Sequence, residues 1–260
     1  MKILKEIPKS LLDLPNPPKQ LFYKGNTKLL KNTKVAIVGT RAPNQYTKAL
    51  MPLIVKRISQ YATIVSGGAI GVDKLAHINS FPNTIMVSPS SLDIYYPLQN
   101  KKLIQDIEEN ALILSEYKKG YTPHRYSFLD RNRIVIALGD IVILPQGDIN
   151  SGTSCSAKIA LKLKKPIFTF PHRYSESPLT NSLLEDKKAE AIYNIDNFIN
   201  KYFSRKKTIN AQTNDEILEF CKSAPSFEDA LIKFGNKILE YELMGLLVRE
   251  NNLIKTNVSN

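Results

Sequence analysis

Short apolar runs alternate with amphipathic segments between residues 34 and 170. The runs show little polar alternation, as in strands buried on both faces of a sheet; they are Val35–Val38, Thr63–Val65, Thr84–Val87, Leu112–Leu114, Ile141–Leu144 and Pro166–Phe170. Between the first two runs, apolar residues recur at helical spacing within residues 47–61. The alternation predicts an α/β fold, an extended Rossmann-like doubly wound parallel sheet.

Small residues stand at the ends of these predicted strands or at the start of the helix that follows. The junctions are Gly39-Thr40-Arg41, Ser66-Gly67-Gly68, Pro145-Gln146-Gly147 and Ser151-Gly152-Thr153. Glycine there exposes backbone N–H groups beside the positive end of a helix dipole. Ligands of doubly wound sheets bind beyond the carboxyl ends of the strands. We therefore expect a phosphate-bearing ligand along one rim of the sheet.

The rest of the chain divides into three segments around this domain of residues 34–202. Residues 1–33 are rich in Pro, Lys and Leu and predict an irregular lead-in packed on the sheet domain. Residues 203–214 are polar and basic without periodicity, which is typical of a linker. Residues 215–260 have the pattern of three helices and a small hairpin, so we expect a small winged-helix-like C-terminal domain.

The charge balance points to a polyanionic partner. The formal net charge is +12 and the isoelectric point is near 9.5, which favours nucleic acid or an anionic membrane surface. A lysine-rich solvated surface is the alternative, because Lys greatly outnumbers Arg. Only two cysteines occur, and no run is long and apolar enough to span a membrane. We expect a cytoplasmic protein without a membrane partner.

A second group of candidate residues lies in Phe128-Leu129-Asp130-Arg131-Asn132-Arg133, with Arg125 just upstream. One helix face could meet phosphates while Phe128 stacks on a base, as in single-strand binders; a core position for Phe128 fits the pattern equally. No catalytic Ser/His/Asp or Cys/His arrangement and no metal-ligand cluster is visible in the sequence. These observations favour a binding protein that is not an enzyme and has no cofactor or metal.

The ordered motifs resemble the DprA/Smf family, the DNA-processing proteins of bacterial natural transformation. The motifs are VAIVGTR (35–41), SGGAIGVDKLAH (66–77), SLDIYYP (91–97), LSEY (114–117), FLDRNRIVIALGD (128–140) and SGTSCSAKIA (151–160), with PPKQLFYKGN (17–26) before them and ILEYELMGLL (238–247) after them. The resemblance implies a protein that binds single-stranded DNA, forms a homodimer and helps to load the recombinase RecA onto incoming strands.

By position, the resemblance also implies the residues of a nucleic-acid pocket. They are Gly39, Thr40, Arg41, Ser66, Gly67, Gly68, Arg125, Phe128, Asn132, Ser151 and Gly152, to which Lys162 and Lys165 are added on charge. The chain departs from the family at residues 178–181 and 188–189, where glycines are usual. We therefore expect a different loop shape there. The short leader leaves no room for an N-terminal helical domain, so we expect a compact member.

A second reading is an enzyme of the nucleoside-monophosphate phosphoribohydrolase type on a similar sheet. Those enzymes resemble this chain at residues 145–147 and 151–153, where they carry a Pro-Gly-Gly-x-Gly-Thr turn followed by a catalytic Glu. Here Thr153 is followed by Ser154, Cys155, Ser156, Ala157 and Lys158. Because no carboxylate stands in the catalytic position, the sequence favours the binding protein.

Overall fold

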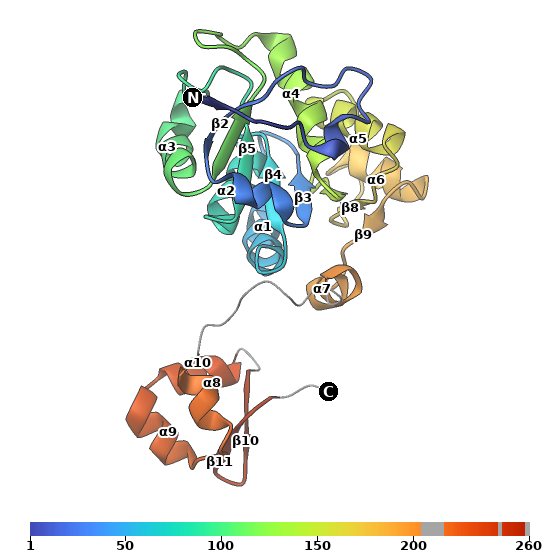
Figure 1. Cartoon of the computed structure of the whole chain (residues 1–260). Coiled ribbons are helices and arrows are strands. Elements are labelled where there is room, and N and C mark those ends of the chain that lie inside the picture. Colours follow the sequence, from blue (N-terminus) through green and yellow to red (C-terminus); the bar gives the residue numbers. More distant parts are fainter. Residues whose placement is uncertain (204–215, 244–245, 258–260) are drawn as a thin grey trace. The chain divides into compact units, whose positions relative to one another are not determined.

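The computed structural model describes residues 1–203, 216–243 and 246–257, which belong to two compact units (Figure 1). The larger unit ends at residue 207 and the smaller begins at residue 208. Beyond Phe203, the predicted linker lies outside the described residues. Among the helices of the described ranges, none is long and apolar enough to cross a bilayer.

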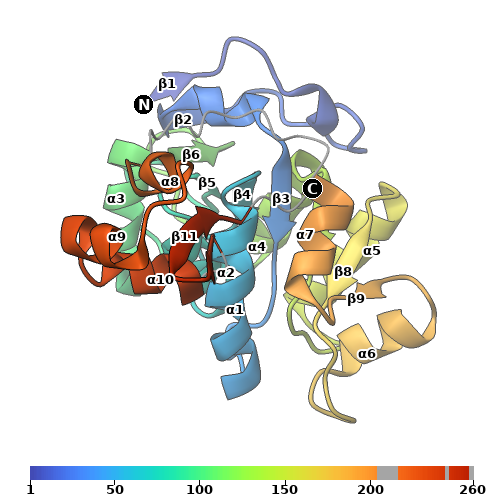
Figure 2. The ribbon, with the colours of Figure 1, turned by 90° about the horizontal axis from the view of Figure 1, so that it is seen from below.

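A nine-stranded sheet forms the centre of the larger unit, in the order β1-β2-β6-β5-β4-β3-β7-β8-β9 (Figures 1 and 2). All neighbouring strands from β6 to β9 are parallel, so the predicted Rossmann-like doubly wound sheet is confirmed. The strands are β1 (Lys2–Ile3), β2 (Phe22–Gly25), β3 (Lys34–Ile37), β4 (Thr63–Ser66), β5 (Thr84–Val87), β6 (Leu112–Ser115), β7 (Ile141–Ile143), β8 (Ile167–Thr169) and β9 (Glu190–Ala191).

The N-terminal segment is more regular than the sequence predicts. Within residues 1–33, β2 pairs antiparallel with β6, Phe22 lying opposite Ser115, and β1 pairs antiparallel with β2. The lead-in that the sequence predicts to be irregular therefore contains two strands of the sheet. Strand β2 pairs with backbone groups at the outer edge of β6 that would otherwise be unpaired. The buried Phe22 ring of β2 also packs with Ile104 and Ile113.

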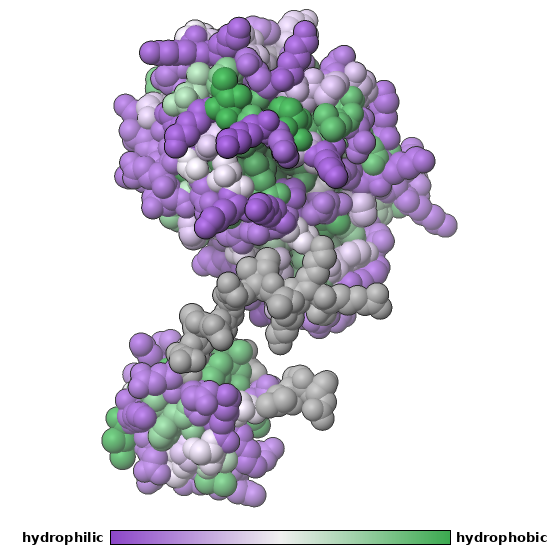
Figure 3. All heavy atoms as spheres, viewed as in Figure 1, coloured by the Kyte–Doolittle hydropathy of each residue, from purple (hydrophilic) through white to green (hydrophobic). Residues whose placement is uncertain are grey.

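Helices cover both faces of the sheet, because apolar side chains along each strand point alternately to one face and the other. On β3, Val35 and Ile37 join one core cluster, whereas Ala36 joins the other. The first face carries α1 (Gln45–Ile58), α2 (Val72–Ser80), α3 (Lys101–Asn110) and α7 (Ile195–Phe203); the second carries α4 (Arg125–Leu138), α5 (Gly152–Lys162) and α6 (Pro178–Glu185). The surface in Figure 3 is mostly hydrophilic, with hydrophobic residues at several places on the face shown.

The strand order reverses between β3 and β7. After β3 the chain continues through β4, β5 and β6 on one side, and it returns to add β7 on the other. Beyond the two strands, the Thr40 N–H donates to the Gln146 carbonyl over 3.0 Å. Such a reversal leaves a crevice at the carboxyl ends of the strands, so this point positions the candidate site.

The smaller unit has its own core. Helices α8 (Glu216–Cys221), α9 (Phe227–Phe234) and α10 (Lys237–Leu243) precede an antiparallel hairpin of β10 (Leu247–Glu250) and β11 (Leu253–Thr256). Its buried side chains are Ile217, Cys221, Ala230, Ile238, Leu247 and Ile254. The Ser226 hydroxyl caps α9 by accepting from the Asp229 N–H over 3.0 Å.

Candidate functional site

A cavity of about 630 Å³ opens beyond the carboxyl ends of β3 and β7, at the strand-order reversal. Its walls are residues 38–41 after β3, the first half of α4, and residues 149–155 where α5 begins. Among the charged side chains of the described residues that line it, Arg41, Arg125, Arg131 and Lys158 are cationic and Asp73 is acidic. This excess of cationic over acidic side chains favours an anionic ligand.

One wall combines a cation with an aromatic ring. The Cζ atom of the exposed Arg41 lies 5.1 Å from the centroid of the half-buried Phe128 ring. Tyr96 supports the same ring, with its centroid 5.5 Å from that of Phe128. Arg125, the first residue of α4, is exposed at the cavity and adds another guanidinium. A phosphate and a base could therefore be held side by side here.

The opposite wall is the N-terminus of α5. The Ser151 hydroxyl caps the helix by accepting from the Ser154 N–H over 3.2 Å. Gly152 is exposed, and a Cβ atom placed on it would meet no atom within 4 Å. The first turn of α5 is therefore open to the cavity, where its backbone N–H groups and dipole favour an anion. Four of the candidate binding residues, Gly39, Thr40, Ser151 and Gly152, line the cavity.

Arg131 lines the cavity but is not among the residues that the sequence predicts to bind nucleic acid. Its side chain is 3% exposed. Its Nη1 donates to the Val87 carbonyl over 2.9 Å, and its Nη2 lies 4.0 Å from Asp73 Oδ2. Burial lowers the pKa of Arg131 to about 10, and burial raises the pKa of Asp73. Helical spacing gives no signal for this position, because residues 134–138 are all buried and mark no single helix face.

The second predicted junction, Ser66-Gly67-Gly68, is closed from the cavity. A Cβ atom on Gly67 would lie 2.1 Å from Nη1 of Arg131, and one on Gly68 would lie 2.3 Å from Cε of Met86. The buried Ser66 hydroxyl donates to the Ile37 carbonyl over 2.7 Å. These three candidate residues do not line the cavity, because the chain's own Arg131 fills the space beside Gly67.

Asn132 lines the cavity, but its side-chain atoms bind within the protein. Its Oδ1 accepts from Nε of Arg131 over 3.0 Å, and its Nδ2 donates to the Ser156 hydroxyl over 3.1 Å. The Ser156 hydroxyl in turn donates to the Gly152 carbonyl over 3.0 Å. This chain of hydrogen bonds joins α4 to the first turn of α5, so Asn132 positions the anion-binding wall.

Lys162 and Lys165 lie away from the cavity. Lys162 is the last residue of α5, whereas Gly152 is its first, so about 15 Å of helix separates them. The Lys165 ammonium donates to the Ala137 carbonyl over 3.3 Å, near the end of α4. Neither lysine lines the cavity. The two lysines, which the sequence analysis adds on charge, therefore stay apart from the other candidate residues in the cavity.

Carboxylates near the rim are engaged in structural contacts. Glu116 accepts twice from Nη2 of Arg133, over 2.7 and 2.8 Å, and Asp140 accepts from the Lys34 N–H over 2.8 Å. Within the cavity, Asp73 accepts from the Ala69 N–H over 3.2 Å beside Arg131. In the described ranges, no group of three or more His, Cys, Asp or Glu side chains is placed to hold a metal ion.

Comparison with known proteins places this geometry among DNA-processing proteins. The sequence profile of DNA recombination-mediator protein A matches residues 2–203. The DNA processing protein DprA of Streptococcus pneumoniae is 36% identical over 167 residues, which are 63% of this chain and 59% of that protein. DprA of Bacillus subtilis is 35% identical over 172 residues, 64% of this chain and 58% of that protein. The chain thus matches less than two thirds of the length of these relatives.

Two solved structures share the fold. DNA processing protein A from Helicobacter pylori, a structure described by its unique single-stranded DNA binding mode, is 51% identical with a TM-score of 0.76, covering 77% of this chain and 94% of that one. DprA from Streptococcus pneumoniae is 31% identical with a TM-score of 0.71, covering 76% of this chain and 71% of that one.

Proposed function

The chain belongs to the DNA recombination-mediator protein A family, and on that premise we propose that it binds single-stranded DNA in the 630 Å³ cavity. One observation carries the proposal: the guanidinium of Arg41 lies over the Phe128 ring in the cavity into which the first turn of α5 opens. The single-stranded DNA binding of the Helicobacter pylori relative supports it.

The two walls divide the recognition of a nucleotide between them. Arg41 and Arg125 contact phosphate by charge-assisted hydrogen bonds, and the backbone of the α5 N-terminus adds uncharged donors. A base stacks on the exposed part of Phe128. None of these contacts reads a base edge, so this cavity binds strands with little preference for sequence.

The wider role follows the family. We infer a cytoplasmic homodimer that handles incoming DNA during transformation and passes the strand to RecA, with the C-terminal unit as a winged-helix-like accessory domain. We further propose that the protein is not an enzyme. The acidic residue among the described lining residues, Asp73, is held by Arg131 and the Ala69 N–H, an arrangement that favours a structural role over proton transfer.

Replacing Arg41 by Ala tests the cavity. We expect a loss of about 1–3 kcal/mol in binding free energy for a labelled thymidine oligonucleotide, with a shallower dependence of affinity on salt. Fluorescence anisotropy at two salt concentrations measures both. The matched control is Lys162→Ala at the far end of α5. Equal affinities for the two variants would refute the assignment of the cavity.

The enzyme reading has its own test. Incubation of the full chain with nucleoside monophosphates should release no free base above background, as followed by chromatography. Base release that Arg41→Ala abolishes would replace the binding proposal with the phosphoribohydrolase reading.

A further inference from the structure

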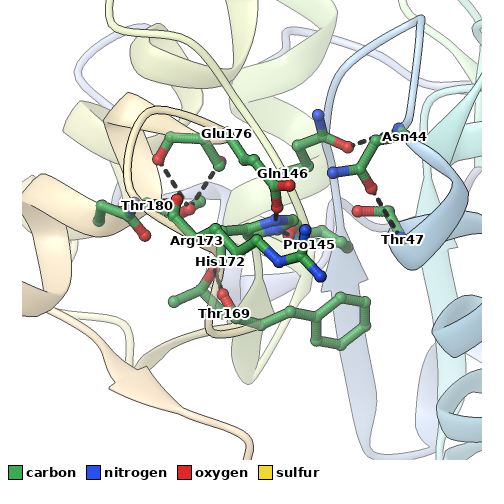
Figure 4. Close-up of polar contacts among 12 residues, drawn as sticks. Asn44, Thr47, Pro145, Gln146, Thr169, His172, Arg173, Glu176 and Thr180 are labelled. Atoms are coloured by element: carbon green, nitrogen blue, oxygen red, sulfur yellow. Dashed lines mark hydrogen bonds and ion pairs between the residues drawn. The ribbon is translucent and has the colours of Figure 1, made fainter.

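A second cavity, of about 420 Å³, lies on the same rim of the sheet. It is lined by Asn44, Gln45, Tyr46, Pro171, Arg173 and Glu176, from the start of α1 and the segment after β8. Figure 4 shows Asn44, Arg173 and Glu176 from these two segments. Gln146 ties the regions of the two cavities together: its side-chain Oε1 accepts from the Asn44 N–H over 2.9 Å, and its carbonyl accepts from Thr40. The three-residue step from Arg41 to Asn44 spans at most about 10 Å, so the cavities are adjacent.

Arg173 and Glu176 bring opposite charges to this cavity without pairing. Their backbones form a turn, in which the Glu176 N–H donates to the Arg173 carbonyl over 3.1 Å. Within residues 1–203, 216–243 and 246–257, no ion pair or side-chain hydrogen bond holds the Arg173 guanidinium, and no hydrogen bond holds the Glu176 carboxylate. Free donors and free acceptors therefore meet at one cavity, which suits a ligand that carries both.

The His172 ring lies beside the Glu176 carboxylate without a hydrogen bond to it. The ring is fully buried, and its Nε2 lies 2.7 Å from the Pro145 carbonyl. A carbonyl only accepts, so Nε2 donates in this contact. Nδ1 lies 3.9 Å from Glu176 Oε2 and is a buried atom without a hydrogen-bond partner in the described part of the chain. At 3.9 Å the ring makes no hydrogen bond to the Glu176 carboxylate.

Tyr46 adds an aromatic ring to the cavity wall. It packs edge-on against His172, with centroids 5.4 Å apart, and against Phe170 at 6.5 Å, each at an interplanar angle of 81°. The residue remains 40% exposed. A buried aromatic pair thus holds a partly exposed ring in a fixed orientation, which is the arrangement on which nucleobases stack.

We propose that this second cavity is a base pocket that prefers guanine and takes one nucleotide of the strand whose backbone lies in the first cavity. Guanine presents N1–H and N2–H to the two Glu176 oxygens, and its O6 and N7 accept from the fork of Arg173. Thymine offers a single N–H and no exocyclic amino group, so it leaves a Glu176 oxygen unmatched. The inference rests on the proposed function, because the guanine belongs to the strand that is bound in the first cavity.

Oligonucleotides of alternating composition test the preference. The full chain is titrated by fluorescence anisotropy with a 16-mer of alternating dT and dG, a 16-mer of alternating dT and dC, and a 16-mer of dT alone. We expect the guanine strand to bind about tenfold tighter than the other two. Glu176→Gln and Arg173→Ala should remove this preference while leaving the affinity for the thymidine strand within about twofold. Both residues are exposed, so the variants should fold.

A mononucleotide separates this inference from the proposed function. Titration of the isotopically labelled full chain with dGMP should shift the NMR signals of Tyr46 and Arg173, whereas dTMP should shift them only at much higher concentration. Arg41→Ala should weaken strand binding and keep the dGMP response, whereas Glu176→Gln should keep strand binding and lose the dGMP response.

The outcomes are distinct. Equal affinity of the wild-type protein for all three strands, or an undiminished guanine preference in Glu176→Gln, overturns the base pocket and leaves the first cavity intact. Wild-type protein that binds no strand refutes the proposed function, and a dGMP response that persists there would show a mononucleotide site in place of a strand subsite.

Discussion

Two junctions that look alike in the sequence have opposite roles in the structure. Gly39-Thr40-Arg41 and Ser66-Gly67-Gly68 both follow buried strands with small residues. The first opens on the cavity, whereas the second is closed by the Arg131 guanidinium, packed against Gly67. A glycine at the end of a strand can therefore expose its backbone to a ligand or make room for a side chain of the same protein.

The largest expected effect comes from removing the side chain that closes the second junction. Arg131→Ala leaves Asp73 buried without its cationic partner and empties the space beside Gly67. We expect the free energy of unfolding to fall by about 3–5 kcal/mol, as measured by urea denaturation. The control is Arg57→Ala, whose exposed ion pair with Asp196 should contribute less than about 1 kcal/mol. Similar losses in both variants would show that Arg131 is not a buried structural cation.

Adding one methyl group at each of two glycines compares the closed and open positions directly. Gly67→Ala places its Cβ atom within 2.1 Å of Arg131 Nη1 and should cost about 1–3 kcal/mol of stability through overpacking. Gly152→Ala meets no atom within 4 Å and should change stability by less than about 0.5 kcal/mol. Thermal denaturation measures the stability of both variants. A larger loss of stability in Gly152→Ala than in Gly67→Ala would contradict the assignment of Gly152 as the open position and Gly67 as the closed one.

The smallest effect near neutral pH, which grows as the pH falls, is a pH dependence behind the closed junction. Burial, with a further contribution from Arg131, lowers the pKa of His77 to about 3, against about 6.5 in the unfolded chain. Below pH 6.5 the unfolded state therefore binds more protons, and stability falls by up to roughly 1.4 kcal/mol per pH unit until about pH 3.

A His77→Gln variant isolates this contribution. The raised pKa of Asp73 acts in the opposite direction as the pH falls, but it is present in both proteins, so the difference between their stability profiles reports His77. Urea denaturation between pH 7 and pH 4 provides the profiles. Parallel profiles would show that His77 takes up its proton in the folded state.

The first junction, the α5 N-terminus and the Arg125–Phe128 segment were predictable from the sequence because each depends on local features. A strand end, a serine cap and an exposed helix start are set by neighbouring residues. By contrast, the predicted roles of Asn132, Lys162 and Lys165 depended on which way each side chain points. Asn132 binds Arg131 and Ser156, and the two lysines lie near the opposite end of α5.

No local sequence pattern predicted the pairing of the N-terminal strands or the second cavity either. The pairing of β2 with β6 joins segments about ninety residues apart, and the residues of the second cavity come from two distant parts of the chain. No periodicity within either segment predicts the partner.

The amino-acid sequence by itself determined the order of buried strands and helices, because burial on both faces of a sheet leaves continuous apolar runs in the chain. It also determined the excess positive charge. Only the tertiary structure decided that Arg131 points inward beside Gly67 while Arg41 stays exposed. The physical reason is that a cation can be buried only where a carbonyl and a carboxylate from other elements compensate it, and Val87 and Asp73 meet Arg131 only in the folded protein.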